Sequence, residues 1–127
     1  MNLTEYFTHR TGTGILATSD AAGRPNAAVY SRPYIIDEHT VAFSMLERRS
    51  YANIRANPRA AYMFLTDGRA NEGVRLYLEA AGEETDPDRI AAIKAQHTST
   101  RTRSEAPRHL VLFNVVETRP LIGDSPA

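Results

Sequence analysis

The segment Glu47–Arg59, with the sequence ERRSYANIRANPR, carries four arginines in a chain whose acidic and basic residues cancel. Arg48, Arg49 and Ser50 follow one another directly after the apolar run Val41–Leu46. Guanidinium groups match phosphate oxygens in geometry, and the free N–H groups at the start of a helix attract anions. If a helix begins near Ser50, these three residues form a site for a phosphate or another anion.

The rest of this segment concerns structure. Tyr51 and Ile54 are three residues apart and share one face of the expected helix, so we expect them to pack inward. Asn57-Pro58 should end the helix, because a residue before proline avoids the helical conformation. The alternative to an anion site is a solvated helix face on which Glu47 neutralises one of the arginines.

Composition limits the remaining functions. The chain has 127 residues, a net charge of zero and no cysteine. A general nucleic-acid surface is disfavoured because such partners select a basic face, and thiol chemistry is excluded. No apolar stretch reaches the roughly 20 residues that a membrane helix needs. We therefore expect one domain over residues 1–127, with its core at about 12–123, in a cytoplasmic protein without a nucleic-acid or membrane partner.

The histidines and glycines do not form a recognisable catalytic or metal site. His9, His39, His97 and His109 are scattered and show no i, i+4 pair, so we expect no metal site. His39 is expected in a turn and His97 at a helix C-terminus, where a positive charge is favoured. The glycines of Thr11–Gly14, TGTG, precede a strand and lack the spacing of a dinucleotide fingerprint.

Alternating and apolar runs predict six short strands. They cover residues 14–20, 26–37, 41–46, 60–67, 74–84 and 109–123. The first three are joined by short loops, which favour antiparallel pairing. Pro33 donates no hydrogen bond, so we expect a bend or bulge within the second strand. With one helix near Ser50 and another after the cap residue Asp86, the pattern predicts a mainly β fold, a small antiparallel barrel with helical insertions.

The order of these segments resembles the pyridoxamine 5′-phosphate oxidase-like family of FMN-binding split barrels. The similarity runs from about Gly14 to about Gly123 and is carried by GILATSDAAGRPNAAVYSRPYII, by VAFSMLERRSYANIRANPRAAYMFL, and by the long strand, helix and closing strand that follow. Its most specific piece is Asn-Ile-x-x-Asn-Pro-Arg at Asn53–Arg59. The resemblance implies a six-stranded antiparallel FMN-binding split barrel, and a homodimer with FMN held at the subunit interface.

The resemblance also implies cofactor-binding residues in three places: a strand along the flavin, the end of the next strand beside the ribityl chain and phosphate, and the phosphate-binding turn. In chain order these are Val29, Tyr30 and Ser31; Ser44 and Met45; and Arg48, Arg49 and Ser50. Many family members place a lysine in this turn, whereas the only lysine of this chain is Lys94.

The first hypothesis for the activity is an FMN-dependent oxidoreductase, in which the flavin exchanges electrons with a small-molecule donor and acceptor. The sequence identifies neither the substrate nor a catalytic side chain. The alternative is a non-catalytic or different-cofactor binding module that holds a deazaflavin coenzyme or haem in the same dimer groove. Because some relatives bind haem through a histidine, His97 and His109 are the candidate axial ligands. The polar segment Thr98–Arg108 is either a second anion loop or a simple connection.

Overall fold

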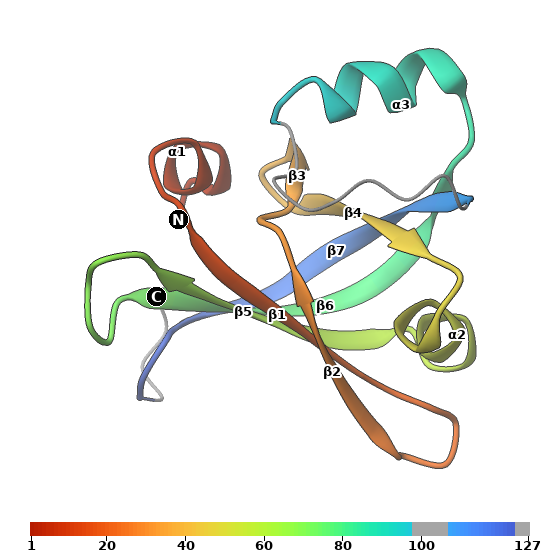
Figure 1. The fold of residues 1–127 in the computed structure, drawn as a ribbon, viewed down its shortest axis with the longest axis horizontal. Coiled ribbons are helices and arrows are strands. Elements are labelled where there is room, and N and C mark those ends of the chain that lie inside the picture. Colours follow the sequence, from red (N-terminus) through yellow and green to blue (C-terminus); the bar gives the residue numbers. More distant parts are fainter. Residues whose placement is uncertain (98–106, 124–127) are drawn as a thin grey trace.

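The computed structural model of this chain describes residues 1–97 and 107–123 (Figure 1). In chain order its strands are β1 (Gly12–Ser19), β2 (Pro25–Tyr30), β3 (Tyr34–Asp37), β4 (Thr40–Leu46), β5 (Arg59–Thr66), β6 (Gly73–Glu84) and β7 (Arg108–Pro120), and its helices are α1 (Leu3–Thr8), α2 (Arg49–Ala56) and α3 (Pro87–Lys94). Most of the predicted Thr98–Arg108 loop, residues 98–106, lies outside the described residues.

The described strands form one antiparallel sheet in the order β2-β1-β5-β6-β7-β4-β3. This confirms the mainly β fold and corrects the number of strands from six to seven. The run expected as one strand over residues 26–37 is two strands, because the chain leaves the ladder at Arg32-Pro33. β2 then pairs with β1, whereas β3 pairs with β4 at the other edge. This bend carries the chain between the two edges and coils the sheet into a split barrel (Figure 1).

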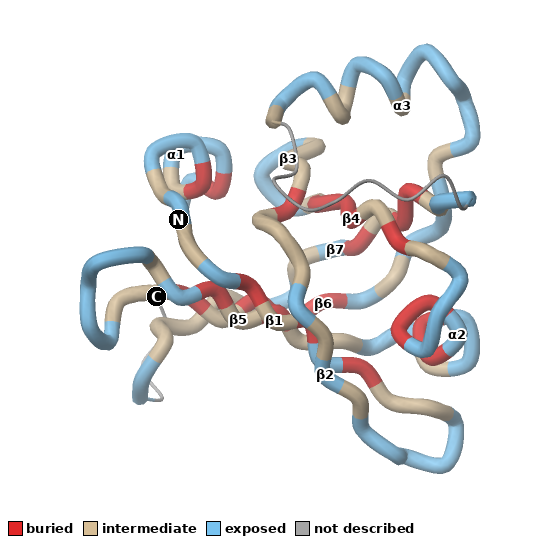
Figure 2. Tube along the Cα trace, viewed as in Figure 1, coloured by how far each residue is buried: buried red, intermediate tan, exposed pale blue. Residues whose placement is uncertain are grey.

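The core lies inside the coiled sheet. Buried and more exposed residues alternate along the central strands (Figure 2). The largest fully buried side chains include Leu16, Tyr62, Phe64 and Phe113. Phe43 is at the centre of an aromatic group, with ring centroids at 4.9 Å from Tyr62 and 5.8 Å from Phe113. The outward-facing residues are more exposed to solvent, as the alternation of apolar and polar residues in the sequence predicts.

No helix is expected at Leu3–Thr8 from the apolar pattern, yet α1 forms there. Asn2 caps it by accepting a hydrogen bond from the Glu5 N–H at 3.0 Å on its side-chain oxygen. Leu3 and Phe7 are four residues apart and both are buried, with the Phe7 ring edge-on to Phe64. A cap and two apolar residues are therefore sufficient to hold this short helix on the barrel.

Helices α2 and α3 match the sequence pattern. Tyr51 and Ile54 are buried in the core, as expected, and α2 ends at Ala56, before Asn57-Pro58. In α3, the side chain of Asp86 caps the helix. In the described part of the chain, no helix has the length and apolar character needed to cross a membrane.

Candidate functional site

The start of α2 differs from the starts of α1 and α3. Those two helices are capped by the side chains of Asn2 and Asp86. In α2 the cap position is occupied by Arg48, whose side chain makes no cap hydrogen bond. An arginine has no acceptor to offer the first N–H groups of the helix. The first turn of α2 therefore presents N–H donors that no side-chain cap satisfies.

Arg48 and Arg49 are both exposed, and among the described residues neither guanidinium has a carboxylate partner. Glu47, the acidic residue next to them, binds the imidazole of His109 instead, with 2.8 Å between Glu47 Oε1 and His109 Nε2. Glu47 therefore pairs with neither arginine in this structure, while the exposure of both side chains agrees with the solvated-face alternative. Two unpaired guanidinium groups beside open N–H donors are suited to a phosphate or another doubly charged anion.

Two serines border this turn. Ser50 is buried, and its hydroxyl accepts a hydrogen bond from Asn26 Nδ2 at 3.3 Å, which joins α2 to the start of β2. Ser44 lies near the end of β4, and its buried Oγ has no hydrogen-bond partner within the described part of the chain. Buried hydroxyls are normally satisfied, so this oxygen can serve a polar group of a ligand. We call Ser44, Arg48, Arg49 and Ser50 the basic corner.

His109 is part of a cluster beside the basic corner. Its Nδ1 lies 3.0 Å from Glu83 Oε2, and its ring stacks on Tyr51 with 4.2 Å between centroids. The Tyr51 hydroxyl donates to the other oxygen of Glu83. The hydrogen bond to Glu47, followed by that to Glu83, raises the pKa of His109. The sequence did not predict this cluster, because Glu47 and His109 are far apart in the chain and nothing local links them.

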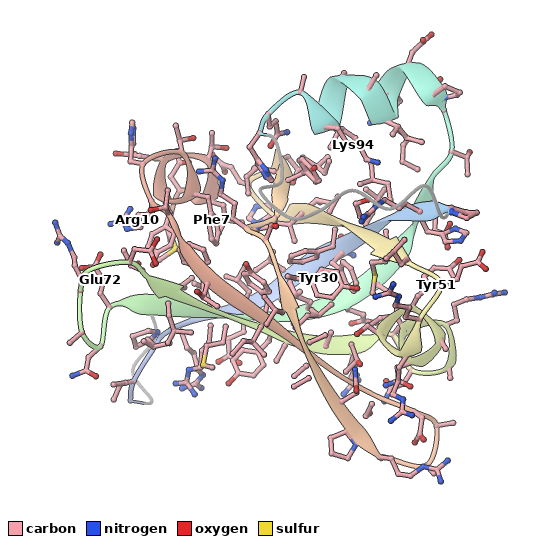
Figure 3. All side chains as sticks on the ribbon, in the orientation of Figure 1. Phe7, Arg10, Tyr30, Tyr51, Glu72 and Lys94 are labelled. Atoms are coloured by element: carbon pink, nitrogen blue, oxygen red, sulfur yellow. The ribbon has the colours of Figure 1, made fainter. Side chains whose placement is uncertain are left out.

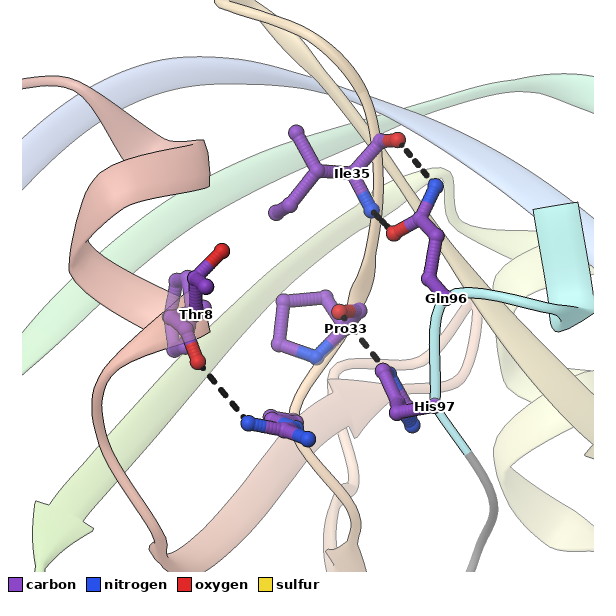
Figure 4. A pocket seen from close by; sticks show the side chains of 7 residues that line it. Thr8, Pro33, Ile35, Gln96 and His97 are labelled. Atoms are coloured by element: carbon purple, nitrogen blue, oxygen red, sulfur yellow. Dashed lines mark hydrogen bonds between the residues drawn. The ribbon is translucent and has the colours of Figure 1, made fainter.

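A pocket of about 100 Å³ lies between α1, the β2–β3 bend and the end of α3 (Figure 4). The side-chain amide of Gln96 binds both the N–H and the C=O of Ile35, and the His97 ring stacks on Tyr34. Burial lowers the pKa of His97, with a smaller contribution from the nearby charge of Arg32. A cofactor normally needs about 300 Å³ or more, so this pocket is too small for a flavin.

The position of His97 after α3 predicts that a positive charge is favoured there, but the lowered pKa of its imidazole contradicts this prediction. The ring is half-buried against Tyr34, with 3.3 Å between His97 Nε2 and the Pro33 carbonyl oxygen. Desolvation is the main cause of the lowered pKa of this imidazole, and it outweighs the opposing hydrogen bond to Pro33.

Comparison with known families identifies the fold. The family model described as pyridoxamine 5′-phosphate oxidase matches residues 4–121. The chain belongs to the pyridoxamine 5′-phosphate oxidase-like FMN-binding split-barrel family. A comparison with curated protein sequences found no match.

Solved structures share this split-barrel fold at low sequence identity. An FMN-binding protein from Syntrophomonas wolfei subsp. wolfei has a TM-score of 0.73 and 23% identity, over 88% of this chain and 78% of that one. HupZ from Group A Streptococcus has a TM-score of 0.71 and 21% identity, over 91% and 90% of the two chains. An F420 reductase has a TM-score of 0.68 and 18% identity, over 91% and 95%. At these identities the likeness concerns the fold.

The strand that the family resemblance predicts to run along the flavin is β2. Val29 is 54% exposed on the outer face of the sheet, whereas Tyr30 packs its ring edge-on to Phe43 in the core (Figure 3). The Tyr62 hydroxyl donates to the Ser31 carbonyl oxygen at 3.0 Å and holds the end of this strand. The side chain of Tyr30 therefore packs in the core, whereas the side chain of Val29 is exposed and available to a ligand or a partner.

Met45 does not lie where the family pattern suggests. Its side chain is fully buried in the core, because it follows Ser44 and successive side chains of a strand point to opposite faces. In this structure the Met45 side chain has no exposed surface for a cofactor, so the prediction for this residue concerns its backbone. By strand alternation the side chain of Ser44 points to the opposite face from that of Met45, and its Oγ is buried there without a partner among the described residues.

Proposed function

We propose that this chain binds FMN and acts as a flavin-dependent oxidoreductase of the pyridoxamine 5′-phosphate oxidase-like family. The observation that carries this proposal is the pair of guanidinium groups of Arg48 and Arg49, at a helix start without a side-chain cap. Neither group has a carboxylate partner in the part of the chain that the structure describes. Membership of an FMN-binding family supports FMN as the phosphate-bearing ligand at this position. The substrate and the electron donor and acceptor are small molecules that the sequence does not specify.

The residues of the basic corner fit a phosphorylated cofactor. Arg48 and Arg49 would bind the phosphate oxygens together with the first N–H groups of α2. Ser44 Oγ would supply or accept a hydrogen bond beside the ribityl chain, and Val29 would flank the ring. Many family members have a lysine in this turn, where this chain has arginines. Phosphate would therefore be bound by planar guanidinium groups, each of which can bind two oxygens, and not by the point charge of an ammonium group. When bound, the flavin supplies the hydride or electron transfer, while these side chains hold and orient it.

We further propose that the protein works as a homodimer that completes the cofactor site. The outer face of β2, β1 and β5 carries an apolar row in which Val29, Ile15 and Met63 are cross-strand neighbours. Beside it runs a row of small residues, Ala27, Ala17 and Ala61. A flat apolar strip of this kind suits the same strip of a second copy across a two-fold axis.

Oligomeric state tests the dimer directly. Light scattering after gel filtration should give twice the chain mass for the wild type and a shift toward monomer for Val29→Glu. Val116→Glu places the same charge at an exposed valine of β7 outside the apolar strip, and should remain dimeric. A monomeric wild type would contradict this part of the proposal.

The visible spectrum of the purified protein tests the cofactor. We expect flavin absorption bands in the protein as purified or after addition of FMN, and reduction of the bound flavin by a nicotinamide donor with reoxidation by an acceptor. The absence of flavin bands together with no binding at micromolar FMN would contradict the proposal.

A deazaflavin coenzyme is the second candidate, because the chain shares its fold with an F420 reductase and such a coenzyme also carries a phosphate for the basic corner. Binding of the deazaflavin without binding of FMN would favour it. Haem is the weaker alternative, since both ring nitrogens of His109 already bind carboxylates. A Soret band in the purified protein would support haem nonetheless.

A further inference from the structure

His109 connects two carboxylates from different parts of the chain. Nε2 lies 2.8 Å from Glu47 in the turn before α2, and Nδ1 lies 3.0 Å from Glu83 on β6. The imidazole is 24% exposed, Glu83 is 30% exposed and Glu47 is 64% exposed by side chain. The stacked Tyr51 ring covers one face of the imidazole and donates its hydroxyl to Glu83. The ring is thus fixed in orientation, with both nitrogens directed at acceptors.

This arrangement requires two N–H donors on one imidazole. Ionised carboxylates accept hydrogen bonds and donate none, whereas a neutral imidazole has one N–H group and one lone pair. Only the imidazolium form satisfies both contacts. After loss of the proton, one ring nitrogen would face a carboxylate oxygen with its lone pair, and one of the two contacts would open.

The other charged groups around His109 do not remove this requirement. On α2, the Arg55 guanidinium carbon lies 5.7 Å from the centre of the Tyr51 ring, and on β7 Arg108 is the exposed neighbour in sequence. Among residues 1–97 and 107–123, the elements packed against the imidazole therefore contribute Glu47, Glu83, Tyr51, Arg55 and Arg108. The two carboxylates are the groups that bind the ring nitrogens directly.

We propose that His109 is a positioning residue for the basic corner: as an imidazolium it holds Glu47 away from Arg48 and Arg49, so that a proton on His109 favours anion binding there. The proposal rests on the anion site of the proposed function but not on FMN as its ligand. Glu47 immediately precedes Arg48 in the chain. Once released, its carboxylate would compete with the anion for the two guanidinium groups, and the nearby positive charge of His109 would also be lost. Both effects weaken anion binding as the pH rises.

Sulfate is the appropriate probe because its charge stays constant while a phosphate monoester gains charge near pH 6, about where histidine titrates. Two-dimensional NMR would follow the amides of Arg48, Arg49 and Ser50 during sulfate titrations from about pH 5.5 to 8.5. In the wild type we expect the affinity to fall by about fivefold or more over this range. By linkage, saturating sulfate should raise the pKa of His109, measured from its ring C–H signals.

Two variants and one control separate positioning from general effects. H109Q should lose the pH dependence and bind sulfate at pH 5.5 as weakly as the wild type does at high pH. E47Q, which changes an exposed side chain, should lower the pKa of His109 and reduce the pH dependence of sulfate binding. H9Q changes an exposed histidine at the end of α1 and should keep the wild-type profile.

The outcomes distinguish the role proposed for His109 from the proposed binding of FMN. An unchanged pH dependence in H109Q would overturn the role of His109 even if FMN binds. A pH-dependent sulfate affinity that H109Q abolishes would support it even if FMN does not bind, and would then count against the proposed cofactor alone. No response of the basic-corner amides to sulfate at any pH would overturn both.

Discussion

The phenol of Tyr62 reaches over β1 and holds the backbone of Ser31. Its oxygen lies 3.0 Å from the Ser31 carbonyl oxygen and 3.5 Å from that of Tyr30. The Tyr62 ring is fully buried, and burial strongly raises the pKa of its hydroxyl, which therefore remains a donor. A core residue of β5 thus fixes the end of β2, the strand proposed to run along the flavin.

Removing this hydroxyl should loosen the end of β2. For Tyr62→Phe we expect a loss of about 0.5–1.5 kcal/mol in the free energy of unfolding, the usual net value of one hydrogen bond. Hydrogen exchange should become faster at the amides of Val29–Ser31. Urea unfolding and exchange measured by mass spectrometry would check both. Tyr77→Phe, on the outer face of β6, is the matched control, and an equal effect there would contradict the specific role of Tyr62.

Gly14 provides the space through which Tyr62 reaches β2. A Cβ at Gly14 would lie 2.0 Å from the Tyr62 hydroxyl oxygen and 2.4 Å from the Tyr30 carbonyl oxygen. We expect Gly14→Ala to destabilise the fold by about 1–3 kcal/mol, as overpacking of a core does. In urea unfolding, the added change Tyr62→Phe should recover part of this loss but not all of it, because the Tyr30 carbonyl oxygen and the ring Cζ of residue 62 still lie 2.4 and 2.5 Å from the methyl group. A Gly14→Ala protein as stable as the control Thr13→Ala would refute the argument.

Gly14 illustrates which structural features the sequence specifies and which it does not. The absence of a dinucleotide fingerprint in Thr11–Gly14 was predicted from spacing alone. The actual reason for Gly14, a close approach of Tyr62 from another strand, depends on pairing between β1 and β5. Strand positions follow from alternation within a short window, whereas strand partners depend on contacts between distant segments. The break at Pro33 was expected as a bend, but its role in carrying the chain between sheet edges required the topology.

The most specific family motif, Asn53–Arg59, turns out to be structural. Asn53 Nδ2 donates to the buried Thr18 Oγ1 at 3.1 Å, and Asn57 Nδ2 donates to Ser19 Oγ at 2.9 Å. Both amides fasten α2 to β1. The motif therefore indicates the fold, while the residues proposed to bind the ligand lie immediately before it. This explains why the sequence could identify the family more firmly than the cofactor.

Asn53→Ala should destabilise the protein more than Asn57→Ala. Asn53 and Thr18 are both buried, so truncation of the amide leaves Thr18 Oγ1 without its donor and should cost about 1–3 kcal/mol. The Asn57–Ser19 bond is only partly buried, and water can replace the lost group. Thermal or urea unfolding of the two variants would measure the difference. The reverse order of stability would show that the bond to Thr18 is not the main attachment of α2.

The candidate site was partly predictable. Arg48, Arg49 and Ser50 were assigned to a helix start from residue type alone, and the structure places them there. The pairing of Glu47 with His109 could not be predicted, because the two residues are 62 positions apart and neither belongs to a local pattern. Met45 was assigned to the cofactor site by analogy with the family. Alternation along the strand places its side chain on the opposite face from that of Ser44, which could have been inferred from the sequence itself.

The stability of the protein should depend on pH through His109. Its pKa is raised in the folded state, so the stabilisation by Glu47 and Glu83 is fully present below the unfolded pKa of about 6.5 and is lost as the pH rises through the folded pKa. Urea unfolding of the wild type and His109→Gln at several pH values should show a difference that shrinks with increasing pH. A difference that grows with pH would show that the folded protein prefers the neutral imidazole.

The paired substitution Arg48→Ala/Arg49→Ala tests the phosphate site itself. FMN affinity should fall by at least tenfold, which is about 1.4 kcal/mol, because both guanidinium groups are lost. Stability should change little, since the two side chains are exposed and have no carboxylate partner among the described residues. Fluorescence titration with FMN and with riboflavin, which lacks the phosphate, would separate phosphate binding from ring binding. The double substitution should weaken FMN and leave riboflavin unchanged. Arg55→Ala/Arg59→Ala removes the same charge from the same segment; if it weakened FMN equally, net charge and not the start of α2 would be the cause.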